Sequence, residues 1–154
     1  MTLKVGDPAP DFTKPIDGGG GITLSKLKGK NVIIYFYPKD DTPGCTKEAC
    51  GFRGALPNFG KVNAVVIGVS RDGVASHDKF KAKHGLPFAL VSDEDGAVCQ
   101  AYGAWVQKSM YGRTYMGIDR ATFLVDKQGK IRGIWRKVKV PGHVEEVLAA
   151  VSAL

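Results

Sequence analysis

The 154-residue sequence has no long hydrophobic run, and this absence limits where the chain can act. No stretch approaches the 18 or more consecutive apolar residues that indicate a transmembrane helix. The first residues, MTLKVGDPAPDF, also lack the apolar core and the small-residue cleavage site of a secretory signal. We therefore expect a cytoplasmic protein with no membrane partner.

Cysteine is scarce as well, because the chain contains only Cys45, Cys50 and Cys99. An odd number in a chain expected to be cytoplasmic argues against a framework of structural disulfides and favours catalysis, redox sensing or burial. The spacing of Cys45 and Cys50 is not CxxC, and no histidine lies near them in sequence, so we expect no zinc site. Redox chemistry carried out by cysteine thiols needs no organic cofactor either.

Acidic residues are outnumbered, since 22 Lys and Arg face 15 Asp and Glu and give a formal charge of +7. Such an excess can indicate an anionic partner such as nucleic acid. Here, however, the basic residues are scattered in short groups, with no aromatic-interleaved stripe and no nucleic-acid motif. We interpret them as a solvated basic surface and expect no nucleic-acid partner. A non-enzymatic binding module that uses this surface is the alternative.

The apolar pattern predicts one α/β domain over residues 1–154, because this length suits a single core. Two runs rich in β-branched residues, 31–37 and 64–69, predict strands buried on both faces. A glycine-rich stretch at 17–21 predicts a hairpin or loop tip. The other predicted elements are helices at 43–59, 77–84 and 94–102, a strand at 88–91, a hairpin of 121–125 and 131–135, and a closing helix with Val144, Val147, Leu148, Val151 and Leu154 on one face.

This order, alternating strands and helices followed by a hairpin, predicts a mixed central β-sheet with helices on both faces. A thioredoxin-like fold satisfies it. Other α/β sandwiches satisfy it too, so the order alone leaves the fold open.

Cys45 lies at the start of the predicted helix 43–59. Thr42 is a suitable N-cap, and Pro43 suits the first helical position. Cys45 then occupies about the third position, where backbone N–H groups have no partner within the helix. A helix N-terminus lowers the pKa of a cysteine below its ordinary value of about 8.5, and Gly44 leaves the approach uncrowded. We therefore interpret Cys45 as a reactive thiolate rather than a small buried residue.

Cys50 cannot bond to Cys45 while this helix is intact. In a regular helix the two Cα atoms would lie about 8 to 9 Å apart, whereas a disulfide needs about 4.4 to 6.8 Å. Either Cys50 is a core residue, or the first turns unwind after Cys45 is oxidised. The low helix propensity of the segment favours unwinding, because it contains Gly44, Gly51 and Gly54. We interpret Cys99, in another predicted helix, as structural, with a backup resolving role as the alternative.

Pro38, Thr42 and Cys45 reproduce the P-x-x-x-T-x-x-C signature of the peroxiredoxins. The sequence resembles the bacterioferritin comigratory protein, or Q-type, subgroup of that family. The resemblance covers nearly the whole chain and includes Gly6–Phe12, Tyr35–Pro38, Gly68–Ser70 with Asp72, Phe88–Asp93, Tyr102–Trp105 and Arg120–Phe123. It implies a thioredoxin-like fold with an N-terminal β-hairpin extension, and reduction of hydrogen peroxide and alkyl hydroperoxides to water or alcohols.

The resemblance also implies roles for individual residues. Cys45 is similar to the peroxidatic cysteine and Cys50 to a resolving cysteine that forms an intramolecular disulfide. Thr42 resembles the hydroxyl that binds thiolate and peroxide, and Arg120 the arginine beside the thiolate. The remaining pocket residues implied are Pro38, Pro43, Gly44 and Glu48. Thioredoxin or a similar dithiol is the implied reductant, and a monomer is the implied state.

The nearest alternative enzyme is a dithiol–disulfide oxidoreductase acting on proteins. Thioredoxin-like enzymes of that kind use CxxC and a facing cis-proline. Here Asp119, Arg120 and Ala121 precede the candidate strand without a proline, which argues against this alternative. The loop 18–21 and the segment 110–116 depart from the family pattern, so the resemblance implies nothing about the rim of the site or the preferred peroxide.

Overall fold

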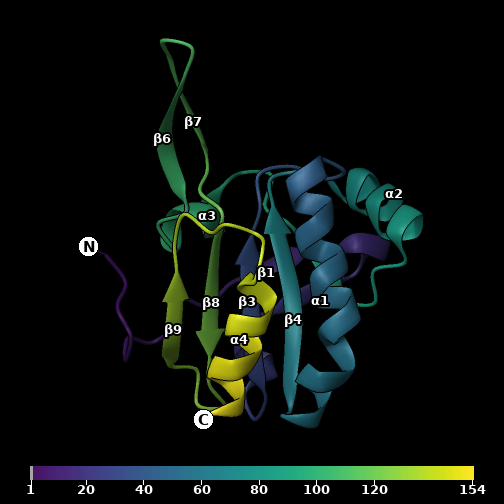
Figure 1. Ribbon diagram of the computed structural model, residues 1–154, viewed down its shortest axis with the longest axis vertical. Coiled ribbons are helices and arrows are strands. Elements are labelled where there is room, and N and C mark those ends of the chain that lie inside the picture. The colour runs from purple at the N-terminus through teal and green to yellow at the C-terminus, as the bar shows by residue number, and fades with distance from the viewer. Residues whose placement is uncertain (1) are drawn as a thin grey trace.

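The computed structural model describes residues 2–154, and its centre is a five-stranded mixed sheet (Figure 1). The strands lie in the order β5-β4-β3-β8-β9. β3, β4 and β5 run parallel to one another, while β8 pairs antiparallel with both β3 and β9. Their bounds are β3 (Asn31–Phe36), β4 (Ala64–Ser70), β5 (Ala89–Ser92), β8 (Ala121–Val125) and β9 (Ile131–Trp135). The predicted mixed sheet is therefore confirmed.

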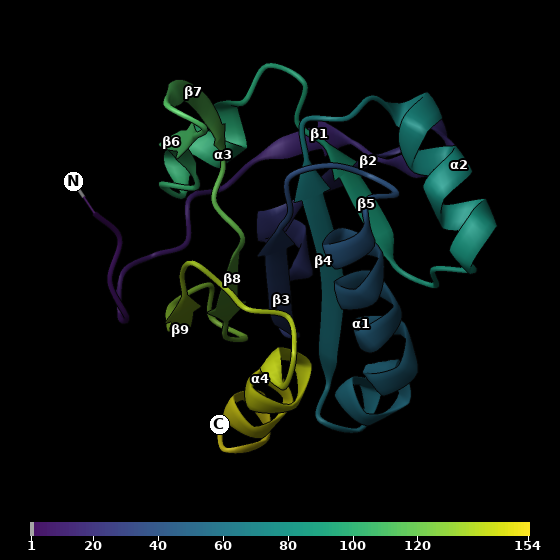
Figure 2. The same cartoon turned by 45° about the horizontal axis from the view of Figure 1, so that its top comes forward.

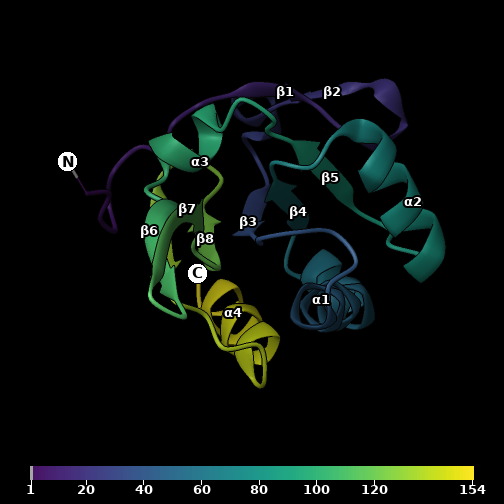
Figure 3. The same ribbon diagram turned by 90° about the horizontal axis from the view of Figure 1, so that it is seen from above.

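Both faces of the central strand β3 are buried, as its unbroken apolar sequence predicts. Because side chains alternate along a strand, Ile33 and Tyr35 enter one core cluster while Ile34 and Phe36 enter the other. The helices α1 (Pro43–Lys61) and α4 (His143–Ser152) cover the first face. The second face is covered by α3 (Ala97–Ala101) and the N-terminal segment, and α2 (Val74–His84) lies beside β5 (Figure 3).

The predicted N-terminal hairpin is present. β1 (Thr13–Pro15) pairs antiparallel with β2 (Gly21–Thr23), and the short 3-10 helix η1 (Asp17–Gly19) joins them. Gly18 and Gly19 have φ values of 79° and 86°, in the left-handed region that glycine reaches without steric cost. A second 3-10 helix, η2 (Leu24–Leu27), leads into β3, and Figure 2 shows the hairpin crossing behind the top of the sheet.

Three predicted helices have different limits in the structure. The closing helix, α4, ends at Ser152, so Leu154 is exposed and does not lie on its apolar face. α2 begins at Val74 rather than at residue 77, because Gly73 precedes it without the polar N-cap side chain that marks a helix start in sequence. α3 covers only 97–101 instead of 94–102. Residues before it form a turn in which Asp93 accepts the N–H groups of Val98 and Cys99 and so fixes the helix start.

The sequence did not predict a hairpin at 105–118. β6 (Trp105–Met110) and β7 (Arg113–Ile118) pair antiparallel and project away from the sheet as an arm (Figure 1). Most of their residues are exposed or half-buried, so the alternation of apolar and polar side chains that identifies a half-buried strand is missing. Among the described residues, no helix is both long and apolar enough to cross a membrane.

Candidate active site

The candidate site lies where β3 ends and α1 begins. Residues 37–42 form the connecting loop, and Thr42 has an extended backbone immediately before the helix. The N–H of Thr46 donates to the Thr42 carbonyl at 2.8 Å and closes the first turn. Cys45 is the third residue of α1 and is 1% exposed. The predicted position of Cys45 is confirmed, and the free N–H groups of this turn favour negative charge on its sulfur.

Arg120 brings a permanent positive charge to this sulfur. It lies on the short connection between β7 and β8, with Nη2 at 3.4 Å from Cys45 Sγ and Nη1 at 2.7 Å from Glu48 Oε1. A guanidinium presents several N–H donors in one plane, so one side chain can bind both groups. Arg120 thus reaches from the start of the neighbouring strand β8 to join two residues of the first turns of α1.

Gly44 makes this approach possible. A Cβ atom at residue 44 would lie 3.2 Å from Nη2 of Arg120, which is closer than nine in ten Cβ contacts in proteins. The sequence suggested that Gly44 leaves the sulfur open to substrate. In the structure the space above Gly44 is instead occupied by the guanidinium, so the glycine serves the approach of Arg120.

The Thr42 hydroxyl does not cap α1, although Thr42 occupies the N-cap position. Its Oγ1 donates to the carbonyl of Lys39 at 2.9 Å. Because the hydroxyl hydrogen is engaged there, the oxygen presents its lone pairs as an acceptor. Among the described residues, no hydrogen bond joins Thr42 to Cys45.

Glu48 is completely buried beneath the arginine. Burial raises the pKa of Glu48 to about 7, although the charge of Arg120 and its hydrogen bond act in the opposite direction. Oε2 of Glu48 has no hydrogen-bond partner among the described residues, and neither has the buried hydroxyl of Tyr35. Burial, followed by the negative charges of Glu48 and Cys45, raises the pKa of Tyr35. Burial thus disfavours negative charge on Glu48 and Tyr35, and the positive charge of Arg120 partly offsets this effect.

Cys50 lies five residues further along the same helix, half-buried and in the free thiol form. The helix beyond it is firmly packed. A Cβ at Gly51 would lie 3.1 Å from Val144 Cγ2, and the ring of Phe52 stacks on Tyr35 with centroids 4.7 Å apart. α4 therefore holds α1 from residue 51 onward, whereas residues 43–50 form the part of α1 that precedes this contact.

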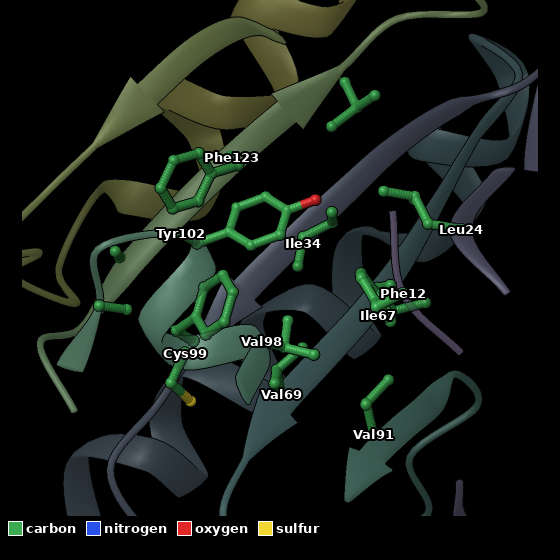
Figure 4. Close-up of a cluster of buried hydrophobic side chains, with 14 of the residues drawn as sticks. Phe12, Leu24, Ile34, Ile67, Val69, Val91, Val98, Cys99, Tyr102 and Phe123 are labelled. Carbon is green, nitrogen blue, oxygen red and sulfur yellow. The ribbon is translucent and has the colours of Figure 1, made fainter. Parts of the chain in front are cut away.

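Cys99 lies in the core cluster on the opposite face of the sheet, among Val98, Val69 and Tyr102 (Figure 4). It is fully buried, and burial, followed by a hydrogen bond with Asp93, raises the pKa of Cys99. Cys45 belongs to the cluster on the α1 face. The sheet thus separates Cys99 from Cys45.

The two pocket prolines occupy different surroundings. Pro43 is the first residue of α1. Pro38 lines a groove between the connecting loop 37–42 and the β6–β7 arm, together with Arg71, Glu94, Trp105, Lys108, Tyr115, Met116, Gly117 and Ile118. The arm, which the sequence did not predict, therefore forms one wall beside the loop that leads to Cys45.

Sequence reasoning missed a buried cluster next to this loop. Asp40, Asp72 and His77 bring three ligand-type atoms within 4.8 Å of one another, a spacing that could suit a metal ion. The carboxylate and imidazole atoms are, however, already engaged in hydrogen bonds within the protein. Only the acidic loop sequence KDD gave any signal of this cluster, because its histidine lies far away along the chain.

The chain matches the model of the AhpC/TSA family over residues 5–134. It is 55% identical to a protein of Coxiella burnetii named putative peroxiredoxin bcp, over 96% of this chain and 98% of that protein. It is 49% identical to peroxiredoxin Bcp of Bacillus subtilis, over 96% of this chain and 94% of that protein.

Solved structures show the same similarity. A mutant of PrxQ from Xylella fastidiosa matches with a TM-score of 0.94 at 43% identity, covering 99% of this chain and 98% of that one. A Xanthomonas campestris bacterioferritin comigratory protein matches with a TM-score of 0.89 at 48% identity, covering 92% and 90%. That structure is described in terms of the alkyl peroxide reduction activity of the Xanthomonas protein.

Proposed function

This chain belongs to the AhpC/TSA family and is a peroxiredoxin, a thiol peroxidase with a thioredoxin-like fold, and we propose that Cys45 is its peroxidatic cysteine and Cys50 its resolving cysteine. The observation that carries this proposal is the Arg120 guanidinium 3.4 Å from Cys45 Sγ at the start of α1. A nearby cation and a helix N-terminus both favour the thiolate, which is the nucleophilic form of cysteine.

In the first step the Cys45 thiolate attacks the terminal oxygen of a hydroperoxide. The S–O bond forms as the O–O bond breaks, and the departing oxygen takes a proton and leaves as water or alcohol, so that Cys45 becomes a sulfenic acid. Arg120 stabilises the negative charge as it moves from sulfur to the leaving oxygen. Thr42 Oγ1 accepts the O–H of the peroxide and orients it, since the hydroxyl hydrogen of Thr42 is held by Lys39.

In the second step residues 43–50 unwind and the Cys50 thiol attacks the sulfenic acid. The S–S bond forms, and the sulfenic oxygen leaves as water. Phe52 and Gly51 stay packed against Tyr35 and Val144, so they limit the unwinding to the first turns. A thioredoxin-type dithiol then reduces the disulfide and restores both thiols.

We propose further that hydrogen peroxide and alkyl hydroperoxides are the substrates, and that the protein is a cytoplasmic monomer. An intramolecular disulfide needs no partner subunit. Cys99 is the alternative resolving cysteine. Its full burial on the opposite face of the sheet disfavours it, because it would require rearrangement of a second core cluster.

The proposal is tested by peroxide-dependent oxidation of reduced thioredoxin, followed through NADPH and thioredoxin reductase. Cys45→Ser should abolish turnover. Cys50→Ser should retain one rapid turnover with peroxide but fail to recycle, whereas Cys99→Ser should behave like the parent. Mass spectrometry of the peroxide-treated parent should find a peptide with Cys45 joined to Cys50. A Cys45–Cys99 bond, or normal recycling of Cys50→Ser, would refute the role of Cys50.

A further inference from the structure

A buried polar network lies beside the site and takes no part in the proposed chemistry. His77, in the first turns of α2, has no exposed surface. Its Nδ1 lies 2.7 Å from Asp40 Oδ2, and its Nε2 lies 2.9 Å from the carbonyl oxygen of Val91 in β5. The imidazole ring of His77 therefore connects α2, the loop 37–42 and strand β5.

The two neighbours of the ring determine its protonation. A backbone carbonyl only accepts hydrogen bonds, and so does an ionised carboxylate. A neutral imidazole has a single N–H, so one of its two contacts would set a lone pair against an oxygen. Both contacts are satisfied when the ring carries two protons, which makes His77 an imidazolium paired with the Asp40 carboxylate.

The other groups around the ring agree with this assignment. Asp40 also accepts from the hydroxyls of Tyr37 at 2.6 Å and Ser76 at 2.8 Å, which stabilise its carboxylate. A second carboxylate, Asp72, accepts the backbone N–H of Asp40 at 2.8 Å. Burial alone would lower the pKa of His77, but the hydrogen bond and charge of Asp40, the Val91 carbonyl and the charge of Asp72 together raise it. A neutral ring would leave the buried carboxylate of Asp40 and the half-buried one of Asp72 without the charge of this ring beside them.

The same network fixes the loop that carries the reacting groups. Asp40 is two residues before Thr42, and it ties the loop to the start of α2. Asp41 ties it to the other end of that helix, with contacts of 2.8 Å to Lys83 and 3.0 Å to His84. Asp41 has a φ of 57°, a left-handed conformation that a residue other than glycine adopts at some cost. The loop is therefore anchored to both ends of α2, by Asp40 near its start and by Asp41 at its last residues.

We propose that the buried Asp40–His77 ion pair is a positioning element that holds Thr42 at the correct place to orient the peroxide while the first turns of α1 are intact. It acts through the loop and touches no reacting atom. The inference rests on the proposed role of Cys45, whose thiolate it does not create. That thiolate is stabilised by Arg120 and the α1 N-terminus, and neither belongs to the loop.

The inference can be tested by comparing two reactions of Cys45, alkylation and oxidation by peroxide. The rate of Cys45 alkylation by iodoacetamide depends on the thiolate and on access to the sulfur, whereas the rate of its oxidation by hydrogen peroxide depends also on orientation by Thr42. We expect Asp40→Asn and His77→Gln each to slow oxidation by about 10- to 100-fold, the size of effect produced by a displacement of about 1 Å in a reacting geometry. Alkylation should change less than about twofold, so the ratio of the two rates should fall.

Asp95→Asn is the matched control, because it removes an exposed carboxylate that pairs with Lys14 rather than with the loop. Its ratio should equal that of the parent. Nitrogen NMR of the parent should find both ring nitrogens of His77 protonated at pH 7. A singly protonated ring, or an unchanged rate ratio in whichever of Asp40→Asn and His77→Gln folds, would overturn the inference. If the parent Cys45 itself fails to react with peroxide, it is the proposed function that is wrong.

Discussion

Replacing Glu48 by glutamine should make the protein more stable at alkaline pH. Glu48 is buried and its pKa is raised from 4.5 to about 7. Between these two values the folded state holds a proton that the unfolded state has released. The stability contributed by the protonated form is therefore complete below about pH 4.5 and is lost as the pH rises through 7. One pKa unit corresponds to about 1.4 kcal/mol, so the loss between pH 5 and pH 8 is about 2 to 3 kcal/mol.

Glutamine keeps the shape of the side chain and an oxygen that can accept from Arg120 Nη1, but it does not ionise. The free energy of unfolding of Glu48→Gln, relative to the parent, should therefore rise by about 2 to 3 kcal/mol between pH 5 and pH 8. Guanidinium denaturation of the reduced protein at these two pH values, followed by tryptophan fluorescence, measures this difference directly. Glu94→Gln removes an exposed carboxylate and is the matched control, for which we expect no pH-dependent difference.

A constant offset between Glu48→Gln and the parent at both pH values would refute the reasoning, because it would mean that Glu48 titrates alike in the folded and unfolded states.

The same variant should also alter catalysis. In the parent, Glu48 becomes charged beside Arg120 as the pH passes about 7, so we expect the rate of Cys45 oxidation to change there. In Glu48→Gln this change should be absent.

Three further substitutions test the geometry of the site. Arg120→Lys should slow Cys45 oxidation by peroxide about 100-fold, because one ammonium group cannot reproduce the two contacts of the guanidinium with Cys45 and Glu48, and stopped-flow fluorescence would measure the rate. Gly44→Ala should slow the same step about 10-fold, since its Cβ displaces Arg120 Nη2; an unaltered rate would show that the close approach has no catalytic value. Gly54→Ala places a methyl group in open space and should raise the free energy of unfolding by about 0.5 to 1 kcal/mol. Because residue 54 lies beyond the packed Phe52, the rate of disulfide formation should not change, and a slower rate would show that unwinding extends past Phe52.

The strands and the site cysteine could be predicted because their signals are local. Buried parallel strands are continuous apolar runs, and the segments 31–37 and 64–69 needed no other information. Thr42, Pro43 and Cys45 are likewise set by their positions at a helix start. The hairpin at 121–125 and 131–135 has the bounds expected from its glycine-containing turn.

The rest depends on contacts between residues far apart in sequence. The residues alone left Arg120 undecided between a surface arginine and a site residue, and only the family resemblance placed it beside Cys45. The Asp40–His77 pair joins residues 37 positions apart, and no pattern within either segment indicates it. The β6–β7 arm was missed for a different reason: its exposed strands bury no continuous face, so no periodicity marks them.

Glu48 and the unwinding of α1 are physically linked. Glu48 lies within residues 43–50, between the loop held by Asp40 and the helix held by Phe52. When this segment unwinds, Glu48 enters water and its pKa returns toward 4.5, so unwinding releases its proton between about pH 4.5 and pH 7, and a rise in pH across this range favours the unwound state. In the reduced protein, contacts of Arg120 with the Cys45 sulfur and with Glu48 hold this segment in its helical form. Oxidation converts the thiolate into a neutral sulfenic acid and removes one of these two contacts. The segment is thus held by fewer contacts at the stage of the proposed cycle in which Cys50 reaches Cys45.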